Sequence, residues 1–132
     1  MLKYQFIILL TFCVLQLRSQ SHWESIVTET DDFKYFLPVA EPADDWKALN
    51  FNDQNWLTGK GGFGYADNDD NTIIAATKSL FLRKTFNLPN TVIVSNLMID
   101  IDYDDAFVAY LNGVEIGRSE NLPAGKPGVN TE

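Results

Sequence analysis

One pair of residues, Asn112-Gly113, constrains the fold of this chain more than any other feature of the sequence. It separates two short runs rich in aromatic and branched residues, 107–111 and 114–118. Asparagine and glycine both tolerate the positive φ angles of a type I′ turn, so an Asn-Gly pair between two such runs is typical of a β-hairpin. The sequence therefore predicts two antiparallel strands joined by a tight turn.

A second pattern lies directly upstream, at the end of the segment 92–103. Leu97, Ile99, Ile101 and Tyr103 alternate with Met98, Asp100 and Asp102. A period of two residues predicts a strand, which leads through the pair Asp104-Asp105 into the hairpin. Further strands are predicted at 33–39 and within 73–86, with one helical turn opening at 43–46. The predicted fold class is all-β, an antiparallel β-sandwich or jelly roll.

The core is expected to be aromatic. The 132 residues are 45% hydrophobic and 13% aromatic, which suits one globular domain. We expect Trp46, Leu49, Phe51 and Trp56 in this core. The glycines of 59–64 are expected to let the backbone pack closely beneath neighbouring aromatic rings. A phosphate-binding loop is excluded there, because Lys60 is followed by Gly61 and no helix is predicted to follow.

The first 19 residues have the order of features of a secretory signal peptide. Lys3 precedes an apolar run from 6 to 17, and small residues follow at Ser19 and Ser21. The run is too short for a membrane span. We therefore predict a signal peptide at 1–19, a loose lead-in at 20–32 and a folded module at 33–132. The predicted location is extracellular or on the cell surface, with no membrane insertion after cleavage.

The charge of the chain limits its partners. The formal net charge is −8, and removal of the signal peptide would leave eight basic against 18 acidic side chains. Nucleic acid and anionic lipid both require a basic face, so neither is an expected partner. Cleavage would also remove Cys13, the only cysteine, so that no disulfide could stabilise the mature protein.

Four motifs occur in an order that resembles a known family. They are 46–56 with its two tryptophans, the glycine-rich 59–65, the strand 81–86, and 104–118 with the Asp-Asp pair and the hairpin. This combination resembles the galactose-binding-like β-sandwich module of large secreted bacterial proteins, over roughly residues 33–128. Such modules lie beside spore-coat-kinase-like, lamin-tail, glycoside hydrolase or secretion-sorting domains.

The resemblance has two departures. Ala106 stands where the family usually has glycine. Family members also continue through one or two further strands that close the sandwich, and no such segment follows residue 118 here. The resemblance therefore implies that these residues are the N-terminal part of a longer secreted protein, truncated at the C-terminal end of the sandwich. Domains further along that protein are then expected partners of the module.

Two acidic segments are candidates for structural Ca²⁺, which binds six to eight oxygen ligands. The candidate ligands are Asp67, Asp69, Asp102 and Asp104. The resemblance supports a calcium ion, since similar folds often carry one. The alternatives are that the Asp104-Asp105 pair caps a turn and that 67–71 is a solvated loop. A true EF-hand is excluded by Thr72 and Lys78 at two required positions.

Carbohydrate binding is the leading functional hypothesis, and it rests on the resemblance. Tyr65, Asp104 and Asp105 are the candidate residues, with glycans or a cell-surface polymer as ligand. Arg83 and Arg118 are expected to form structural ion pairs with acidic side chains. The single histidine, His22, lies at the predicted cleavage region, and no nucleophile motif is present, so we expect no catalysis in this chain. The alternatives are a structural spacer or adhesion domain, or the leading module of an enzyme.

Overall fold

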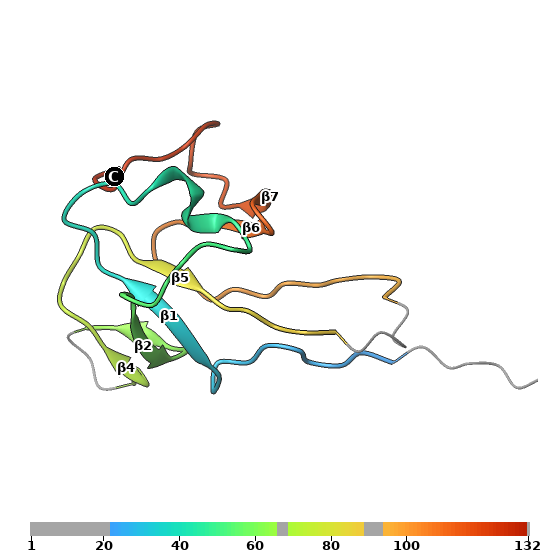
Figure 1. Ribbon diagram of the computed structural model, residues 1–132. Coiled ribbons are helices and arrows are strands. Elements are labelled where there is room, and N and C mark those ends of the chain that lie inside the picture. The colour runs from blue at the N-terminus through green and yellow to red at the C-terminus, as the bar shows by residue number, and fades with distance from the viewer. Residues whose placement is uncertain (1–21, 66–68, 89–93, 132) are drawn as a thin grey trace, which may run out of the picture.

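The computed structural model describes residues 22–65, 69–88 and 94–131, and their secondary structure is essentially all β. Figure 1 shows the arrangement. The described strands are β1 (Asp32–Phe36), β2 (Leu57–Lys60), β3 (Phe63–Gly64), β4 (Thr72–Ile73), β5 (Phe81–Arg83), β6 (Val108–Leu111) and β7 (Val114–Arg118). One 3₁₀ turn, η1, spans Asp44–Lys47. In this part of the chain, no helix has the length and apolar character needed to cross a membrane.

The largest sheet has three strands in the order β2-β1-β5, all antiparallel. Its central strand β1 places Tyr35 opposite both Leu57 and Leu82. The strand predicted at 33–39 is confirmed as β1, although it ends at Phe36. Pro38 explains the early end, because proline restricts the residue before it and has no N–H to donate to a sheet.

The predicted hairpin is confirmed. β6 and β7 pair antiparallel, and Leu111 lies opposite Val114 across the turn. Asn112 and Gly113 have φ angles of 51° and 85°, as a type I′ turn requires. The register then shifts, so that Tyr110 lies opposite Glu115 while Ala109 lies opposite Gly117. The residue left over in β7 makes a bulge, which twists the hairpin locally.

The glycine-rich segment forms two strands that the sequence pattern did not predict. β2 ends at Lys60, and β3 pairs with β4 in a short parallel ladder, the exception in an otherwise antiparallel structure. Gly61 is buried where the chain turns between them. A Cβ at Gly61 would lie 2.5 Å from the carbonyl oxygen of Glu29, so only glycine fits without movement of the backbone.

A cluster of aromatic rings joins the sheets. The Trp46 ring centroid lies 5.0 Å from that of Phe81 in β5 and 5.8 Å from that of Tyr110 in β6. Trp56 is buried, and its ring lies 6.2 Å from Trp46 and 5.7 Å from Phe51. The core position predicted for Trp56 is therefore confirmed, and Trp46 and Phe51 are half-buried in ring contact with it. The prediction for Leu49 is wrong, because its side chain is 68% exposed.

Arg83 fixes the segment around η1 against β5. Its Nε donates a hydrogen bond of 2.9 Å to Asp53 Oδ2, and its Nη1 donates to the carbonyl oxygens of Trp46 and Ala48. Its guanidinium also lies 5.1 Å from the centre of the Phe51 ring. Arg83 thus forms the structural ion pair predicted for it.

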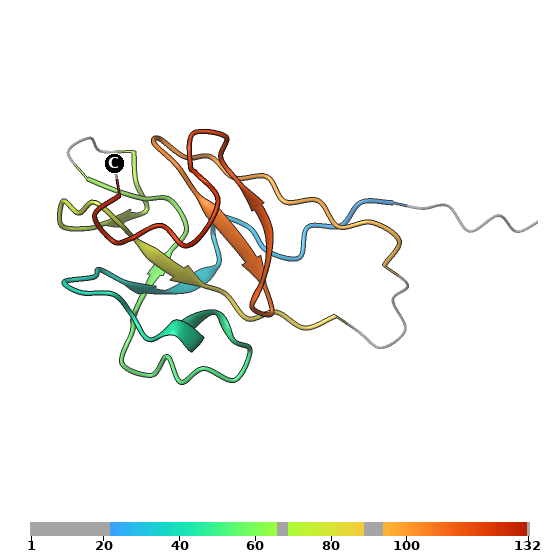
Figure 2. The ribbon, with the colours of Figure 1, turned by 90° about the horizontal axis from the view of Figure 1, so that it is seen from above.

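The long strand predicted over 92–103 is not formed by the described residues 94–103. These residues have no strand assignment and pair with no described strand. Figures 1 and 2 show them as an arm that leaves the body in the same direction as two others, 22–31 and 84–88. The seven described strands therefore form three small sheets, and none of them pairs with residues 94–103 to complete a ladder.

Candidate functional site

The candidate site centres on residues 100–105, which we call the acidic corner. It lies immediately before β6 and is held there by the loop that follows β7. The Phe107 N–H donates to Ser119 Oγ at 3.1 Å, and the Ser119 N–H donates to the Phe107 carbonyl at 3.0 Å. Asn121 Nδ2 donates to the carbonyl oxygen of Asp105 at 2.8 Å. Because Ser119 is buried, these bonds are shielded from water and fix the end of the corner.

The carboxylates of the acidic corner have no cationic partner in the described part of the chain. Asp100, Asp102, Asp104 and Asp105 are all exposed, and none forms an ion pair with a described lysine or arginine. Their oxygens are therefore available to accept hydrogen bonds from a ligand. This distinguishes them from the acidic residues of the body, several of which are paired.

Tyr103 gives the corner an aromatic surface. Its side chain is 46% exposed, and its ring centroid lies 4.7 Å from that of Phe107, with the planes inclined at 65°. The edge-to-face contact holds the ring in place. Sequence reasoning assigned Tyr103 only to a strand. The contacts of Ser119 and Asn121 were also missed, because no local pattern shows that a loop beyond the hairpin returns to this corner.

The second acidic segment follows β3. Asp67 lies outside the described residues, and Asp69 is exposed. Asp70 packs against Gly64, so closely that a Cβ at Gly64 would overlap its carboxylate. Its Oδ2 atom is buried and has no described hydrogen-bond partner. A buried oxygen without a partner is costly, so Asp70 adds one ligand-type atom that the sequence did not single out.

A calcium ion fits these residues only in part. No three acidic, histidine or cysteine side chains converge on one point within residues 22–65, 69–88 and 94–131. Asp69, Asp102 and Asp104 therefore do not come together as a described set. The orphaned oxygen of Asp70 is the one structural observation that favours a cation near this loop, and the calcium hypothesis stays a prediction.

Tyr65 is half-exposed at the end of β3. Among the described residues, no ring contact or hydrogen bond joins it to Asp104 or Asp105. The three predicted carbohydrate-binding residues thus belong to two separate segments, 65 at the second acidic segment and 104–105 at the acidic corner. Their joint role stays a prediction.

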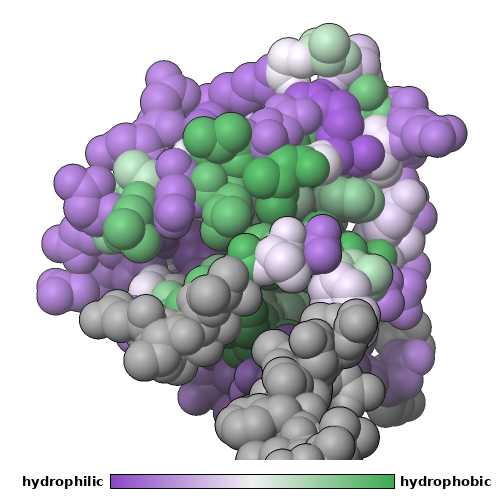
Figure 3. Space-filling model, turned by 90° about the vertical axis from the view of Figure 1, so that its right-hand side faces the viewer, coloured by the Kyte–Doolittle hydropathy of each residue, from purple (hydrophilic) through white to green (hydrophobic). Residues whose placement is uncertain are grey.

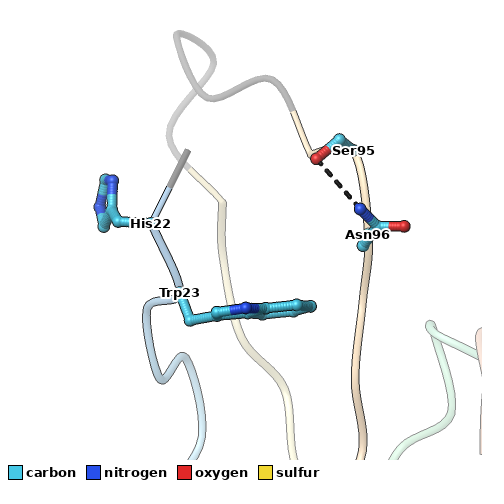
Figure 4. Close-up of a pocket in the computed structure, with 4 residues that line it drawn as sticks. All are labelled: His22, Trp23, Ser95 and Asn96. Carbon is cyan, nitrogen blue, oxygen red and sulfur yellow. Dashed lines mark hydrogen bonds between the residues drawn. The ribbon is translucent and has the colours of Figure 1, made fainter. Parts of the chain in front are cut away.

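A small pocket lies between the arm 22–31 and the start of the arm 94–103. It is lined by His22, Trp23, Ser95 and Asn96, and Figure 4 shows the Trp23 ring directed toward the segment that carries the last two. His22 Nε2 lies 3.8 Å from Glu24, and both side chains are largely exposed to solvent. These residues do not form a triad of nucleophile, base and orienting acid.

Hydrogen bonding shifts several ionisation equilibria outside the candidate site. The Thr28 N–H and then Lys84 donate to Asp31, which lowers its pKa to about 2. Lys126 lowers the pKa of Asp44 by a hydrogen bond, and the same contact raises the pKa of Lys126. Each of these groups is a partner in an ion pair of the body. The shifts therefore indicate structural roles.

Arg118 organises the loop beyond β7. Its Nε and Nη2 form a two-pronged contact with Glu115, at 2.7 and 2.8 Å, and this hydrogen bonding lowers the pKa of Glu115. Other guanidinium hydrogens bind the carbonyl oxygens of Pro123 and Gly125. The structural ion pair predicted for Arg118 is present. Through this loop, Arg118 also supports the chain that carries Ser119 and Asn121.

Comparison with protein-family models, with curated protein sequences and with solved structures gives no match to this chain.

Proposed function

We propose that this chain is a non-catalytic accessory module of a larger secreted protein, and that it binds carbohydrate or another surface polymer at the acidic corner. One observation carries the proposal. The half-exposed ring of Tyr103 lies within a run of carboxylates that have no described cationic partner. The proposed architecture is the galactose-binding-like β-sandwich or jelly roll that the four motifs resemble.

The chemistry of a sugar matches this arrangement. Sugar hydroxyls are hydrogen-bond donors, and the carboxylate oxygens of Asp104 and Asp105 are exposed acceptors. The apolar face of a pyranose packs against an aromatic ring, a surface that Tyr103 supplies here and that Tyr65 supplies at the second acidic segment. Bonds to a charged acceptor are stronger than neutral ones, which favours a polyhydroxy ligand over an apolar one.

That no described cation pairs with these carboxylates has a second consequence. A ligand with negative charge would meet the field of four carboxylates and would be repelled. The proposed ligand class is therefore a neutral or amino-bearing glycan rather than an acidic one. A calcium ion at this site would change that preference, since its charge would offset the carboxylates.

A glycan array probed with the full secreted protein tests the proposal. We expect binding to neutral glycans, and we expect Tyr103→Ala, Asp105→Asn and Tyr65→Ala each to weaken it. Removal of a hydrogen bond to a charged group costs roughly 1.5–3 kcal/mol, which corresponds to about 10- to 150-fold in affinity for Asp105→Asn. Asp45→Asn, at an exposed acid of η1 with no described ion pair, is the matched control and should bind normally.

Circular dichroism separates loss of binding from loss of folding. All four variants should show the spectrum of the unmodified protein. A folded protein that binds no glycan on the array would overturn the carbohydrate proposal. A structural spacer or adhesion domain would then be the better account. Enzymatic turnover of a bound glycan by the full secreted protein would favour a catalytic domain elsewhere in it.

A further inference from the structure

The arm formed by residues 94–103, which we call the open strand, has the properties of a sheet edge without a partner. It is extended, yet none of its backbone N–H or C=O groups takes part in a described backbone hydrogen bond. Each of these groups is an obligatory donor or acceptor. A row of unpaired groups along an extended segment is a template for another strand.

The side chains of the open strand are also exposed. The large apolar ones are Val94, Leu97, Met98, Ile99 and Tyr103, and Ile99 is 54% accessible. Figure 3 views the molecule from the side toward which the arms extend and shows hydrophobic side chains gathered at this surface. The apolar residues Leu97, Ile99 and Ile101 alternate with Met98, Asp100 and Asp102. One face of the strand is therefore apolar, and the other carries Met98 and two carboxylates that have no described cationic partner.

We propose that the open strand binds an extended segment of another polypeptide by strand addition, and that this segment alternates apolar with basic side chains. The main chain of the added segment would satisfy the unpaired groups of residues 94–103. Its apolar side chains would cover Leu97 and Ile99. Its lysines or arginines would lie opposite Asp100 and Asp102, where a cross-strand pair of opposite charges is favourable.

Charge opposes a second copy of this chain as the occupant. Antiparallel pairing of two open strands about Ile101 would place Asp100 of one copy opposite Asp102 of the other, which gives two destabilising like-charge pairs, whereas pairing about Ile99 would place Asp100 opposite Met98. A net charge of −8 for each chain adds to the repulsion. Charge complementarity therefore favours a basic partner segment over self-association.

The proposal does not depend on carbohydrate binding. It uses the backbone of 94–103 and the carboxylates Asp100 and Asp102, whereas the glycan proposal uses the Asp104-Asp105 pair, Tyr65 and Tyr103, and only Tyr103 is common to both surfaces. A glycan has no row of amide donors and acceptors and therefore cannot complete a strand ladder. The two activities can therefore be lost separately: peptide binding in the double variant Asp100→Asn with Asp102→Asn, and glycan binding in Asp105→Asn or Tyr65→Ala.

A set of three synthetic peptides of ten residues tests the inference with the full secreted protein, by isothermal titration calorimetry. The first alternates valine and lysine, the second alternates valine and glutamate, and the third is the first with every second amide N-methylated. We expect only the first to bind measurably. The double variant Asp100→Asn with Asp102→Asn should weaken it about fivefold, the value of two cross-strand charge pairs. The control pair Asp45→Asn with Glu120→Gln, at exposed acids outside the open strand, should bind normally.

Hydrogen exchange gives an independent readout that simple charge attraction would not produce. Amides of 94–103 should exchange rapidly in the free protein and become protected when the valine–lysine peptide is bound. Equal binding of the N-methylated peptide would overturn strand addition, since it would show that only charge is recognised. Protection of these amides before peptide is added would also overturn the proposal. If that protection depended on protein concentration, a second copy would be the occupant.

Discussion

Replacement of Arg83 by methionine should destabilise the protein more than the same replacement of any lysine or arginine in the other ion pairs of the body. Arg83 donates to the Asp53 carboxylate and to the carbonyl oxygens of Trp46 and Ala48. The side chains of Arg83 and Asp53 are only 11% and 25% exposed. Methionine is similar in length and apolar, so Arg83→Met removes all three hydrogen bonds while much of the contact with the Phe51 ring remains.

The magnitude follows from the groups left behind. Removal of one member of a buried ion pair costs about 3–5 kcal/mol, largely because the remaining charge has no partner. Asp53 retains some access to water, which places the expected loss at the lower end, about 3 kcal/mol. For a domain of this size, that loss lowers the melting temperature by roughly 12 °C.

Urea unfolding followed by tryptophan fluorescence is the appropriate assay, because Trp46 and Trp56 lie next to the altered contact. The midpoint should fall with no change in the slope of free energy against urea, as expected for a loss of stability alone. The midpoint of Arg83→Lys should lie between those of the unmodified protein and Arg83→Met. Lysine keeps the charge but lacks the planar guanidinium group that reaches several acceptors. The double variant Arg83→Met with Asp53→Asn should lose less free energy of unfolding than the sum of the losses in the two single variants.

Lys84→Met provides the matched control. Lys84 is the next residue in the chain, and its Nζ lies 2.9 Å from Asp31 in a more exposed ion pair. Exposed pairs contribute little because water and salt screen them. We therefore expect Lys84→Met to be clearly less damaging than Arg83→Met. If the two variants unfold at the same urea concentration, the anchoring role assigned to Arg83 is wrong.

Three further outcomes follow from contacts elsewhere in the molecule. Gly61→Ala should cost roughly 1–3 kcal/mol in a thermal melt, because its new methyl group overlaps the Glu29 backbone, whereas Gly128→Ala meets no atom closer than 3.5 Å and should be neutral. The pKa of Asp31 is depressed to about 2, so its contribution to stability is present above about pH 4 and is lost as the pH falls toward 2. Asp31→Asn should flatten this part of the acid titration, and an unchanged profile would contradict the assignment. If calcium binds near Asp70, EDTA should lower the melting temperature and added Ca²⁺ restore it, whereas an identical melt in both would remove the calcium hypothesis.

The sequence predicted those parts of the fold that depend on local chemistry. The Asn112-Gly113 turn was found correctly because both of its residues must adopt positive φ angles, which few other pairs tolerate. The strand at 33–39 and the helical turn near Asp44 were found for similar reasons, from β propensity and turn residues. The aromatic core followed from the size of Trp46 and Trp56, which a small domain cannot leave in water.

The errors arise where structure depends on distant residues. β2 was missed because glycine is rare in strands, yet Gly59 lies where a Cβ would come within 2.6 Å of Thr72, so a close neighbour requires it. The alternation over 97–103 is correct for a strand, but a strand forms only where another lies beside it. Leu49 was placed in the core from its hydrophobicity alone, which is a weak guide for single residues.

The candidate site shows the same division. Acidic residues at 102–105 are visible in the sequence, but the hydrogen bonds that Ser119 and Asn121 form with this corner come from a loop beyond the hairpin. Likewise, the sequence showed the acids at 67–71 as one run. Only the packing of Asp70 on Gly64 distinguishes one of them from its neighbours.

The distribution of ion pairs separates the groups that stabilise this protein from those available for binding. Lys60, Arg83, Lys84, Arg118 and Lys126 all pair with acids of the body, at 31–53 or at Glu115. The four carboxylates of the acidic corner receive none of these cations. Neutralising Asp100 and Asp102 together should therefore leave the free energy of unfolding unchanged or slightly higher, because it relieves like-charge repulsion. The same double variant should lose affinity for the valine–lysine peptide. A loss of unfolding free energy as large as the loss of binding free energy would instead show that these carboxylates stabilise the fold.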